Sequence, residues 1–301
     1  MCLNANFFIG KIETLDHYQN ITELSDGKVF ALQNIFPLDG RVSAYPSSTV
    51  GYSCANCFLL YEKDGALLLD TGYSSHEDII LQQLSSILEP NTPLSIFPLR
   101  INEFMSVGNA MAIAKEFNVV ECYSQVPDMS FWLDFESTGS KQAKVIPTTV
   151  LKFPSKIGIG ENNRKVDAFG APIQLIATRW VYDETTKTLF TSDSFAQFSQ
   201  EKPEGPWIIE ENKKSDNYNF TKSFLLNSRY WWLEGANTLP LRNDINGIFS
   251  KFKVNTIAPG YGAIINGNNL VNEELSTLMQ ILKDSDREKT NAAYVHRDIE
   301  R

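Results

Sequence analysis

Residues 57–72, CFLLYEKDGALLLDTG, contain two short apolar stretches on either side of Asp64-Gly65. Short apolar runs that are bounded by turn residues are typical of buried strands. Asp-Gly suits a tight turn because both residues tolerate positive φ angles. The stretch therefore predicts a β-hairpin that enters a hydrophobic core and ends in the polar turn Asp70-Thr71-Gly72.

Strand and helix patterns alternate along the rest of the chain. Helices are predicted over residues 76–89, from Ser106 over 106–118, and over the amphipathic stretch 273–289. Strands are predicted over 94–100 and twice within 171–195, and residues 254–265 predict a short strand with a Pro-Gly-Tyr-Gly turn. Residues 201–219, rich in Glu, Lys, Asn and Pro, predict a long surface loop or a lid. Hairpins between strand-helix units favour two packed mixed sheets with helices outside. We expect residues 1–301 to form a single domain.

Composition excludes several classes of partner. A formal net charge of −9 argues against a general nucleic-acid surface or an anionic membrane as partner, because both bind clustered Lys and Arg. The longest apolar runs fall far short of a membrane span, and the N-terminus lacks a signal-peptide pattern, so we expect a cytoplasmic protein. Cys54 and Cys57 form a C-x-x-C pair without neighbouring histidines, and a structural role is favoured for both.

Several motifs occur in an order that resembles the metallo-β-lactamase superfamily. They are NCFLL at 56–60, LLLDTG at 67–72, a helix start at Gly108, TLFTSD at 188–193 and APGYG at 258–262. Residues 188–198, TLFTSDSFAQF, and the aromatic-rich 224–241 resemble the flavodiiron proteins in particular. The resemblance implies a four-layer αββα sandwich equivalent to the β-lactamase domain of that family, a homodimer, and no flavodoxin domain.

Flavodiiron proteins bind two irons through a dense set of histidines and carboxylates. Aligning Gly108 with the family's motif glycine puts Ile101, Glu103, Met105 and Ser106 at the ligand positions of the first motif. The resemblance also places Asp193 at the bridging Asp and Tyr261 at the final His. The chain has three histidines, His17, His76 and His296, and all fall outside the predicted ligand loops. The resemblance therefore implies a cleft that has lost most of its metal ligands.

Three interpretations of this cleft stay open. In the leading one the chain holds no metal, and the cleft binds a small molecule or partner or performs metal-free chemistry with Glu103, Asp193 and Tyr261 as candidate catalytic residues. Salt bridges from Arg100 or Arg179 would then replace the lost metal charge. The remaining candidate pocket residues are Asn102, Met105 and Ser106.

The runner-up is an active hydrolase-like or oxygen-handling enzyme in which Glu103 and Asp193 hold one weakly bound iron, manganese or zinc ion. The third is a structural or regulatory protein with an occluded cleft. Core packing is favoured for the aromatic residues Phe131, Trp132, Trp207, Tyr230, Trp231 and Trp232, although they could line an apolar pocket.

Overall fold

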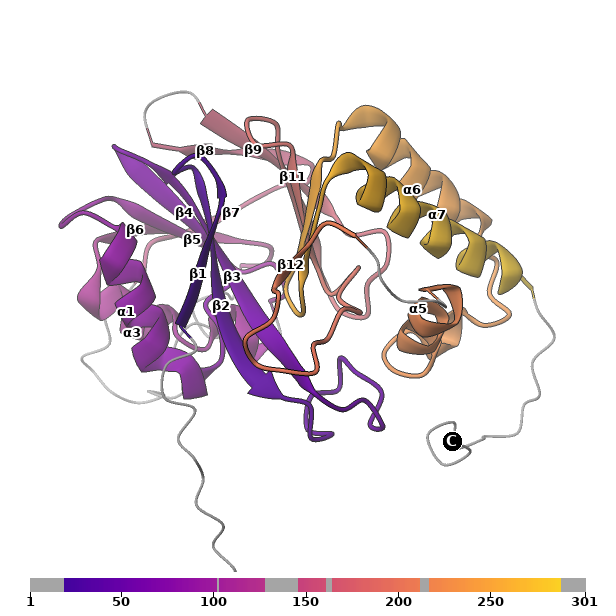
Figure 1. The fold of residues 1–301 in the computed structure, drawn as a ribbon. Helices are drawn as coiled ribbons and strands as arrows, with labels where there is room; N and C mark the ends of the chain where they lie inside the picture. The colour runs from indigo at the N-terminus through magenta and orange to yellow at the C-terminus, as the bar shows by residue number, and fades with distance from the viewer. Residues whose placement is uncertain (1–18, 102, 128–145, 161–163, 212–216, 288–301) are drawn as a thin grey trace, which may run out of the picture.

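The computed structural model describes residues 19–101, 103–127, 146–160, 164–211 and 217–287. Two mixed β-sheets pack face to face with helices on both outer faces, as the αββα prediction requires (Figure 1). Within these residues no helix is long and apolar enough to cross a membrane.

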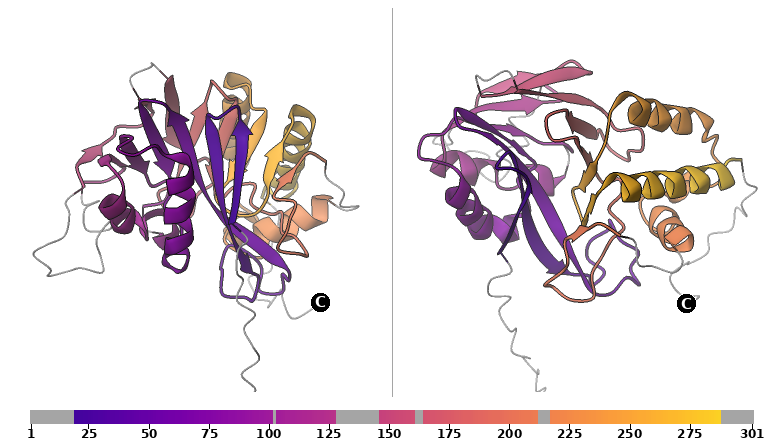
Figure 2. Two further views of the ribbon diagram at one scale, coloured as in Figure 1. Left: turned by 60° about the vertical axis from the view of Figure 1, so that its left-hand side comes forward. Right: turned by 45° about the horizontal axis from the view of Figure 1, so that its top comes forward.

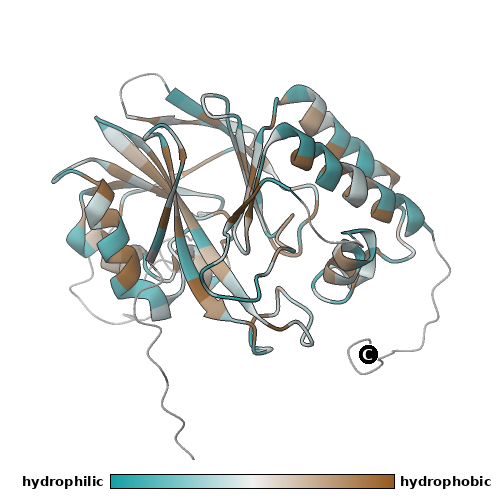
Figure 3. Cartoon of the chain, in the orientation of Figure 1, coloured by the Kyte–Doolittle hydropathy of each residue, from teal (hydrophilic) through white to brown (hydrophobic). Residues whose placement is uncertain are grey.

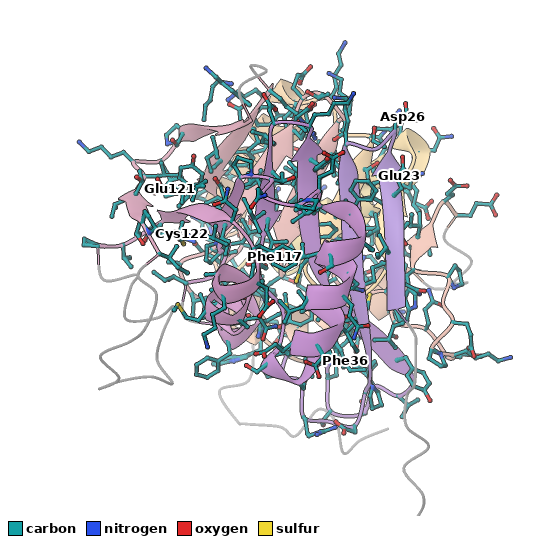
Figure 4. The ribbon with its side chains drawn as sticks, turned by 90° about the vertical axis from the view of Figure 1, so that its left-hand side faces the viewer. Glu23, Asp26, Phe36, Phe117, Glu121 and Cys122 are labelled. Atoms are coloured by element: carbon teal, nitrogen blue, oxygen red, sulfur yellow. The ribbon has the colours of Figure 1, made fainter. Side chains whose placement is uncertain are left out.

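The first sheet is formed by the N-terminal half of the chain. In spatial order its strands are β1 (Gln19–Ser25), β2 (Val29–Pro37), β3 (Tyr52–Glu62), β4 (Gly65–Leu69), β5 (Leu94–Phe97), β6 (Val119–Ser124) and β7 (Thr148–Val150). Neighbours are antiparallel from β1 to β4 and parallel from β4 to β7. Figure 4 shows Asp26 at one end of this sheet and Phe36 at the other, which is the end that carries the candidate site.

The second sheet is formed by the C-terminal half. In spatial order its strands are β12 (Ile208–Ile209), β14 (Ile264–Asn266), β13 (Thr256–Pro259), β11 (Thr188–Ser192), β10 (Arg179–Asp183), β9 (Arg164–Gly170) and β8 (Ser155–Ile159). Strands β8 to β11 form antiparallel neighbours, while β11 and β13 are parallel. The carboxyl ends of β11 and β13 therefore lie side by side.

Helices cover the outer face of each sheet, as the three ribbon views show (Figures 1 and 2). Helices α1 (Glu77–Ile87) and α3 (Ala110–Glu116) cover the first sheet, and α6 (Leu239–Lys251) and α7 (Asn268–Asp284) cover the second. The shorter elements are η1 (Ser74–His76), α2 (Phe104–Val107), α5 (Asn217–Leu226) and η2 (Trp231–Leu233). Helix α5 packs against α7 at the end of the second sheet.

Alternation along β3 places apolar side chains in two layers of the core, because successive strand residues point to opposite faces. Phe58 and Leu60 belong to the cluster between the two sheets, whereas Cys57 and Leu59 belong to the cluster between the first sheet and its helices. Brown, hydrophobic segments accordingly dominate the strands in Figure 3, while the helices carry teal outer faces. The core forms on both faces of each sheet.

The helix predicted over 106–118 is divided into α2 and α3 in the structure. The division falls at Gly108 and Asn109, where the turn after β4 approaches closely. A Cβ on Gly108 would lie 3.1 Å from the carbonyl oxygen of Gly72, and Asn109 Nδ2 donates to the carbonyl of Thr71 at 2.8 Å. Tertiary contacts with this turn therefore override the local helical pattern.

Candidate functional site

Four chain segments that leave strand ends meet at one edge of the sandwich. Asp70 follows β4 and Arg100 follows β5, while Asp193 follows β11 and Tyr261 follows β13. Strands β4 and β5 are parallel, and so are β11 and β13, so each sheet brings two carboxyl ends to the same edge. Arg100, Asp193 and Tyr261, which the sequence analysis singled out, are thereby brought together.

Asn56 of β3 positions the turn that carries Tyr261. Its backbone NH donates to the carbonyl of Gly260 at 2.9 Å, and its side-chain Nδ2 donates to the carbonyls of Pro259 and Gly262 at 2.8 and 2.9 Å. Gly262 has φ +73°, a conformation that favours glycine. These bonds fix the turn between the sheets and direct Tyr261 into the cleft.

Arg100 lies at the centre of the cleft, and its side chain is fully buried. Its Nη1 forms a hydrogen-bonded ion pair with Asp193 and lies 2.5 Å from Glu103 Oε2, and its Nη2 lies 3.7 Å from Asp70 Oδ2. The guanidinium carbon lies 4.9 Å from the centre of the Tyr261 ring. One guanidinium thus contacts three carboxylates and an aromatic face.

Arg229 supplies a second guanidinium from the segment after α5. It forms a hydrogen-bonded ion pair with Glu103, and its Nη1 lies 2.8 Å from Asp193 Oδ1. Glu103 and Asp193 are therefore each shared by two guanidiniums. If all five charged groups of the cluster are ionised, three carboxylates and two guanidiniums leave a formal charge of −1.

Two tyrosines lie over the outer side of this cluster. The hydroxyls of Tyr73 and Tyr261 are 3.0 Å apart, and the Tyr261 hydroxyl also hydrogen-bonds Glu103. Burial raises the pKa of Tyr261 well above its ordinary value, with Glu103 and Tyr73 raising it further against the opposing effect of Arg100. Tyr261 is consequently a neutral hydrogen-bond donor at physiological pH.

Burial and the two guanidiniums act in opposite directions on the carboxyl groups. Burial raises the pKa of Asp70 to about 6, although Arg100 and the NH of Leu99 oppose this shift. Burial also raises the pKa of Glu103, but Arg100 and Arg229 together outweigh it and leave that pKa below the ordinary value. Of Asp70 and Glu103, Asp70 is therefore the carboxyl group whose pKa lies closer to neutral pH.

Two residues close to Asp193, at the end of β11 and in the loop after it, have unusual backbone conformations. Ser192 and Phe195 have φ angles of +54° and +63°, and Asp70 in the facing turn has φ +60°. Non-glycine residues adopt this left-handed region at a cost in free energy and hold it where the surrounding structure determines it. The two turns that carry buried carboxylates are thus held by the fold around them.

A cavity of about 290 Å³ opens on the solvent side of the cluster. Tyr73, Tyr261, Glu103 and Arg229 contribute polar groups to it, and the remaining lining residues are Arg41, Val42, Ser43, Phe104 and Met105. Hereafter it is called the outer pocket. Its position over the ion-pair cluster makes these side chains reachable by a small molecule.

The other residues that the sequence analysis assigned to the pocket differ in their positions relative to the ion-pair cluster. Met105 Sδ accepts a hydrogen bond from Arg100 Nη2 at 3.2 Å, whereas the Ser106 hydroxyl accepts one from the backbone NH of Arg100 and supports the loop from behind. Arg179 does not serve as the second cation: it lies over the Phe153 ring at 4.4 Å and donates to the carbonyl of Thr178. Asn102 lies outside the described residues.

The second cation is Arg229, and the sequence reasoning missed it. It also missed Asp70 and Tyr73, which belong to the recognised LLLDTG motif and the residue after it. Arg229 had a weaker signal, because it lies in an aromatic-rich segment whose approach to the cleft depends on how α5 packs. The only local sign of a role for Arg229 is that a charged residue directly precedes three aromatic residues, Tyr230, Trp231 and Trp232.

The aromatic residues expected in the core are divided in the structure. Tyr230 and Trp207 are buried, but Trp231 and Trp232 are 66% and 40% exposed. Core packing was therefore wrong for these two, because the η2 turn directs them outward. Phe131 and Trp132 lie outside the described residues.

His76, Cys54 and Cys57 lie near the cleft but form none of the ion pairs given for Arg100 and Arg229 in the described part of the chain. His76 ends η1 with its ring centre 6.1 Å from that of Tyr73, while His17 and His296 lie outside the described residues. Cys54 and Cys57 are both free and buried, and burial raises the pKa of each thiol. Within the described ranges, no group of three or more His, Cys, Asp or Glu side chains is arranged to hold a metal ion.

Comparisons with known proteins identify the fold. No protein-family model matches the sequence, and a comparison with curated proteins also gave no match. Among solved structures, rubredoxin oxygen:oxidoreductase from Desulfovibrio gigas is similar with a TM-score of 0.67 at 15% identity, over 88% of this chain and 62% of that one. The flavodiiron protein from Giardia intestinalis gives 0.63 at 12% identity, over 89% of this chain and 60% of that one.

A fragment of diflavin flavoprotein A 5 from Nostoc, residues 1–254, gives a TM-score of 0.62 at 13% identity, over 88% of this chain and 94% of the fragment. The chain thus spans about three fifths of the length of the two longer structures. At sequence identities this low, structural similarity identifies the fold but not the activity. The chain has the metallo-β-lactamase-like fold that forms the core of the flavodiiron proteins.

Proposed function

We propose that this chain is a metal-free relative of the flavodiiron core, and that its cleft binds a small polar molecule or a partner's polar group. The observation that carries the proposal is the buried guanidinium of Arg100, which contacts Asp70, Glu103 and Asp193. Two of these carboxylates, Glu103 and Asp193, fall on the metal-ligand positions that the family resemblance implies. A fixed cation therefore occupies the charge environment in which that family holds iron.

The donor set does not fit a pair of irons. Adjacent metal ions need several imidazole and carboxylate ligands that converge with free lone pairs. Here Glu103 and Asp193 are each engaged by two guanidiniums, and the position of the final histidine carries the neutral phenol of Tyr261. A divalent ion would have to displace Arg100 and would experience repulsion from Arg229. The side chains present therefore do not suit a di-iron centre.

The outer pocket supports binding more than catalysis. Its volume of about 290 Å³ is near the lower end of the range for small-molecule sites, roughly 300–1,000 Å³. Tyr73, Ser43 and Arg229 offer polar contacts beside the apolar side chains of Val42 and Phe104. Two guanidiniums keep Glu103 ionised, so Glu103 cannot donate a proton at neutral pH. Polar recognition is the role that these groups suit.

Metal analysis tests the first half of the proposal. The purified protein would be incubated with Fe²⁺, Zn²⁺ or Mn²⁺, desalted, and measured by plasma mass spectrometry. We expect metal contents far below one ion per chain under each condition. Near-stoichiometric metal that disappears in Asp193→Asn would refute the metal-free proposal, and would favour the alternative of a remodelled metalloenzyme at Glu103 and Asp193.

Thermal-shift measurements test the second half, because a molecule that binds only the folded state stabilises it. The probes would be dicarboxylates, sugar phosphates, nucleotides and small amines. We expect at least one class to stabilise the wild type and to lose this effect in Arg229→Gln. The matched control is Arg242→Gln on α6, which removes a partly buried pair with Asp286, two residues after the end of α7. Equal loss in both variants, or no stabilisation by any probe, would contradict a binding role for the outer pocket.

A further inference from the structure

A second, smaller cavity borders Asp193 and shares no lining residue with the outer pocket. Its volume is about 20 Å³, and it is enclosed by the loop after β11, helix α5, Tyr230 and helix α7. Asp193, Ser194, Gln197, Tyr230 and Glu274 are its main polar lining residues. Hereafter it is called the rear cavity. The interpretation of the cleft as metal-free does not depend on it.

Three oxygen atoms around the rear cavity have unmet hydrogen-bonding capacity. Asp193 Oδ2, Ser194 Oγ and the Tyr230 hydroxyl are buried and have no hydrogen-bond partner among the described residues. These residues are only 4%, 5% and 2% exposed. Native proteins satisfy almost all of their buried polar groups, with protein or with ordered water, because an unpaired one is costly. Three such atoms beside one cavity therefore point to a guest.

We propose that the rear cavity binds an ordered water molecule that bridges Asp193 to Tyr230 and Ser194. The volume suits this guest, since a cavity of roughly 10–15 Å³ or more can hold one water where it offers polar partners, as Asp193, Ser194 and Tyr230 do among the apolar side chains of the lining. The unpaired groups match its hydrogen-bonding capacity as well. A water molecule donates to the carboxylate oxygen Asp193 Oδ2 and accepts from the two hydroxyl groups.

A monovalent cation matches the same groups less well. It would bind Asp193 Oδ2 and the hydroxyl lone pairs, but both hydroxyl hydrogens would still need acceptors. Asp193 Oδ1 already contacts the guanidiniums of Arg100 and Arg229, so its negative charge is compensated from the other side. Water therefore satisfies more of the unpaired groups than a cation does.

The bridging water connects the ion-pair cluster to the helix layer behind it. Gln197, which also lines the rear cavity, donates from Nε2 to Glu274 Oε2 at 2.9 Å, and Asn217 Nδ2 donates to Glu274 Oε1 at 3.0 Å. Glu274 lines the same cavity and offers carboxylate oxygens that could accept the second hydrogen of the water. Asp193 is thereby held by two guanidiniums on one side and by a water-linked network from α5 and α7 on the other.

A high-resolution crystal structure of the wild type tests the proposal directly. We expect an isolated density peak within hydrogen-bond distance of Asp193 Oδ2 and of the Tyr230 or Ser194 hydroxyl. A second crystal grown with rubidium ions should show no anomalous signal there. A direct hydrogen bond from Tyr230 to Asp193 across a collapsed cavity would overturn the proposal, and so would an anomalous rubidium peak.

Two tyrosine variants test which group holds the water. Tyr230→Phe removes one unpaired hydroxyl, and the peak should be lost or displaced toward Ser194. Tyr182→Phe is the matched control, because the buried Tyr182 hydroxyl already donates to the carbonyl of Lys253 at 3.0 Å. Its structure should retain the peak unchanged. A peak that persists at the same position and strength in Tyr230→Phe would contradict the assigned bridge.

Discussion

Replacing Arg100 by methionine tests the central role of its guanidinium. Methionine keeps most of the length and apolar volume of the side chain but removes the charge and every N–H donor. In the variant, Glu103 and Asp193 would share the remaining guanidinium of Arg229, and Asp70 would lose its contact with Arg100. We expect Arg100→Met to fold with much lower stability than the wild type.

The magnitude follows from the burial of the groups involved. The Arg100 side chain is fully buried, and those of Asp70 and Asp193 are only 3% and 4% exposed. Removing one partner of a buried ion pair costs about 3–5 kcal/mol, because the remaining charges are left uncompensated. For a chain of this size, each kcal/mol lowers the melting temperature by roughly 2–4 °C, so the expected decrease is roughly 6–20 °C.

Urea unfolding followed by tryptophan fluorescence would measure the free energy of unfolding of both proteins. Arg242→Met is the control, because its pair with Asp286 is partly exposed and is worth about 0–1 kcal/mol. The deficit of Arg100→Met should also shrink as the pH falls, since protonation neutralises the uncompensated carboxylates. A loss no larger than that of Arg242→Met, or a deficit independent of pH, would refute the reasoning.

Two further predictions concern a carboxyl and two glycines. The folded-state pKa of Asp70 is about 6 against an ordinary 3.8, so between these pH values the folded protein binds more protons than the unfolded chain, and the contribution of Asp70 to stability falls as the pH rises. Asp70→Asn should therefore flatten the dependence of the unfolding free energy on pH between about pH 4 and pH 7, and an unchanged slope would contradict the assignment. Gly262→Ala should destabilise by about 1–3 kcal/mol in urea unfolding, since its φ is +73° and a Cβ would lie 2.6 Å from the Phe198 carbonyl oxygen. In Gly247→Ala, within α6, the added Cβ would have no heavy atom within 4 Å, and the variant should raise the unfolding free energy by about 1 kcal/mol. If both glycine variants changed the unfolding free energy in the same direction, the reasoning would be wrong.

The sequence predicted the layers of the fold better than the contacts of the cleft. Apolar runs, turn residues and helical spacing are local, and they predicted the β3–β4 hairpin, α1, β5, α7 and the αββα arrangement. The division of α2 from α3 was missed because it depends on the contact of Gly108 and Asn109 with the distant turn after β4. The homodimer implied by the family resemblance stays a prediction.

Within the cleft, the strand-end positions of Arg100, Asp193 and Tyr261 followed from the motifs. The identity of the second cation did not, because Arg229 reaches the cluster from the segment after α5, 126 residues from Glu103 along the chain. Arg179 was the weaker choice for a physical reason. It begins β10, where its guanidinium lies over the Phe153 ring and not against the carboxylates of the cluster.

The guanidinium of Arg100 has a consequence for how the fold depends on its surroundings. A bound metal ion stabilises a protein by mass action, so its contribution rises and falls with the free ion concentration and vanishes with a strong chelator. The positive charge of Arg100 is part of the chain and is present in every molecule as soon as it is synthesised. If the cleft is metal-free, as we propose, its folding needs no bound ion, and the stability of the protein should be the same in iron-starved and iron-replete conditions.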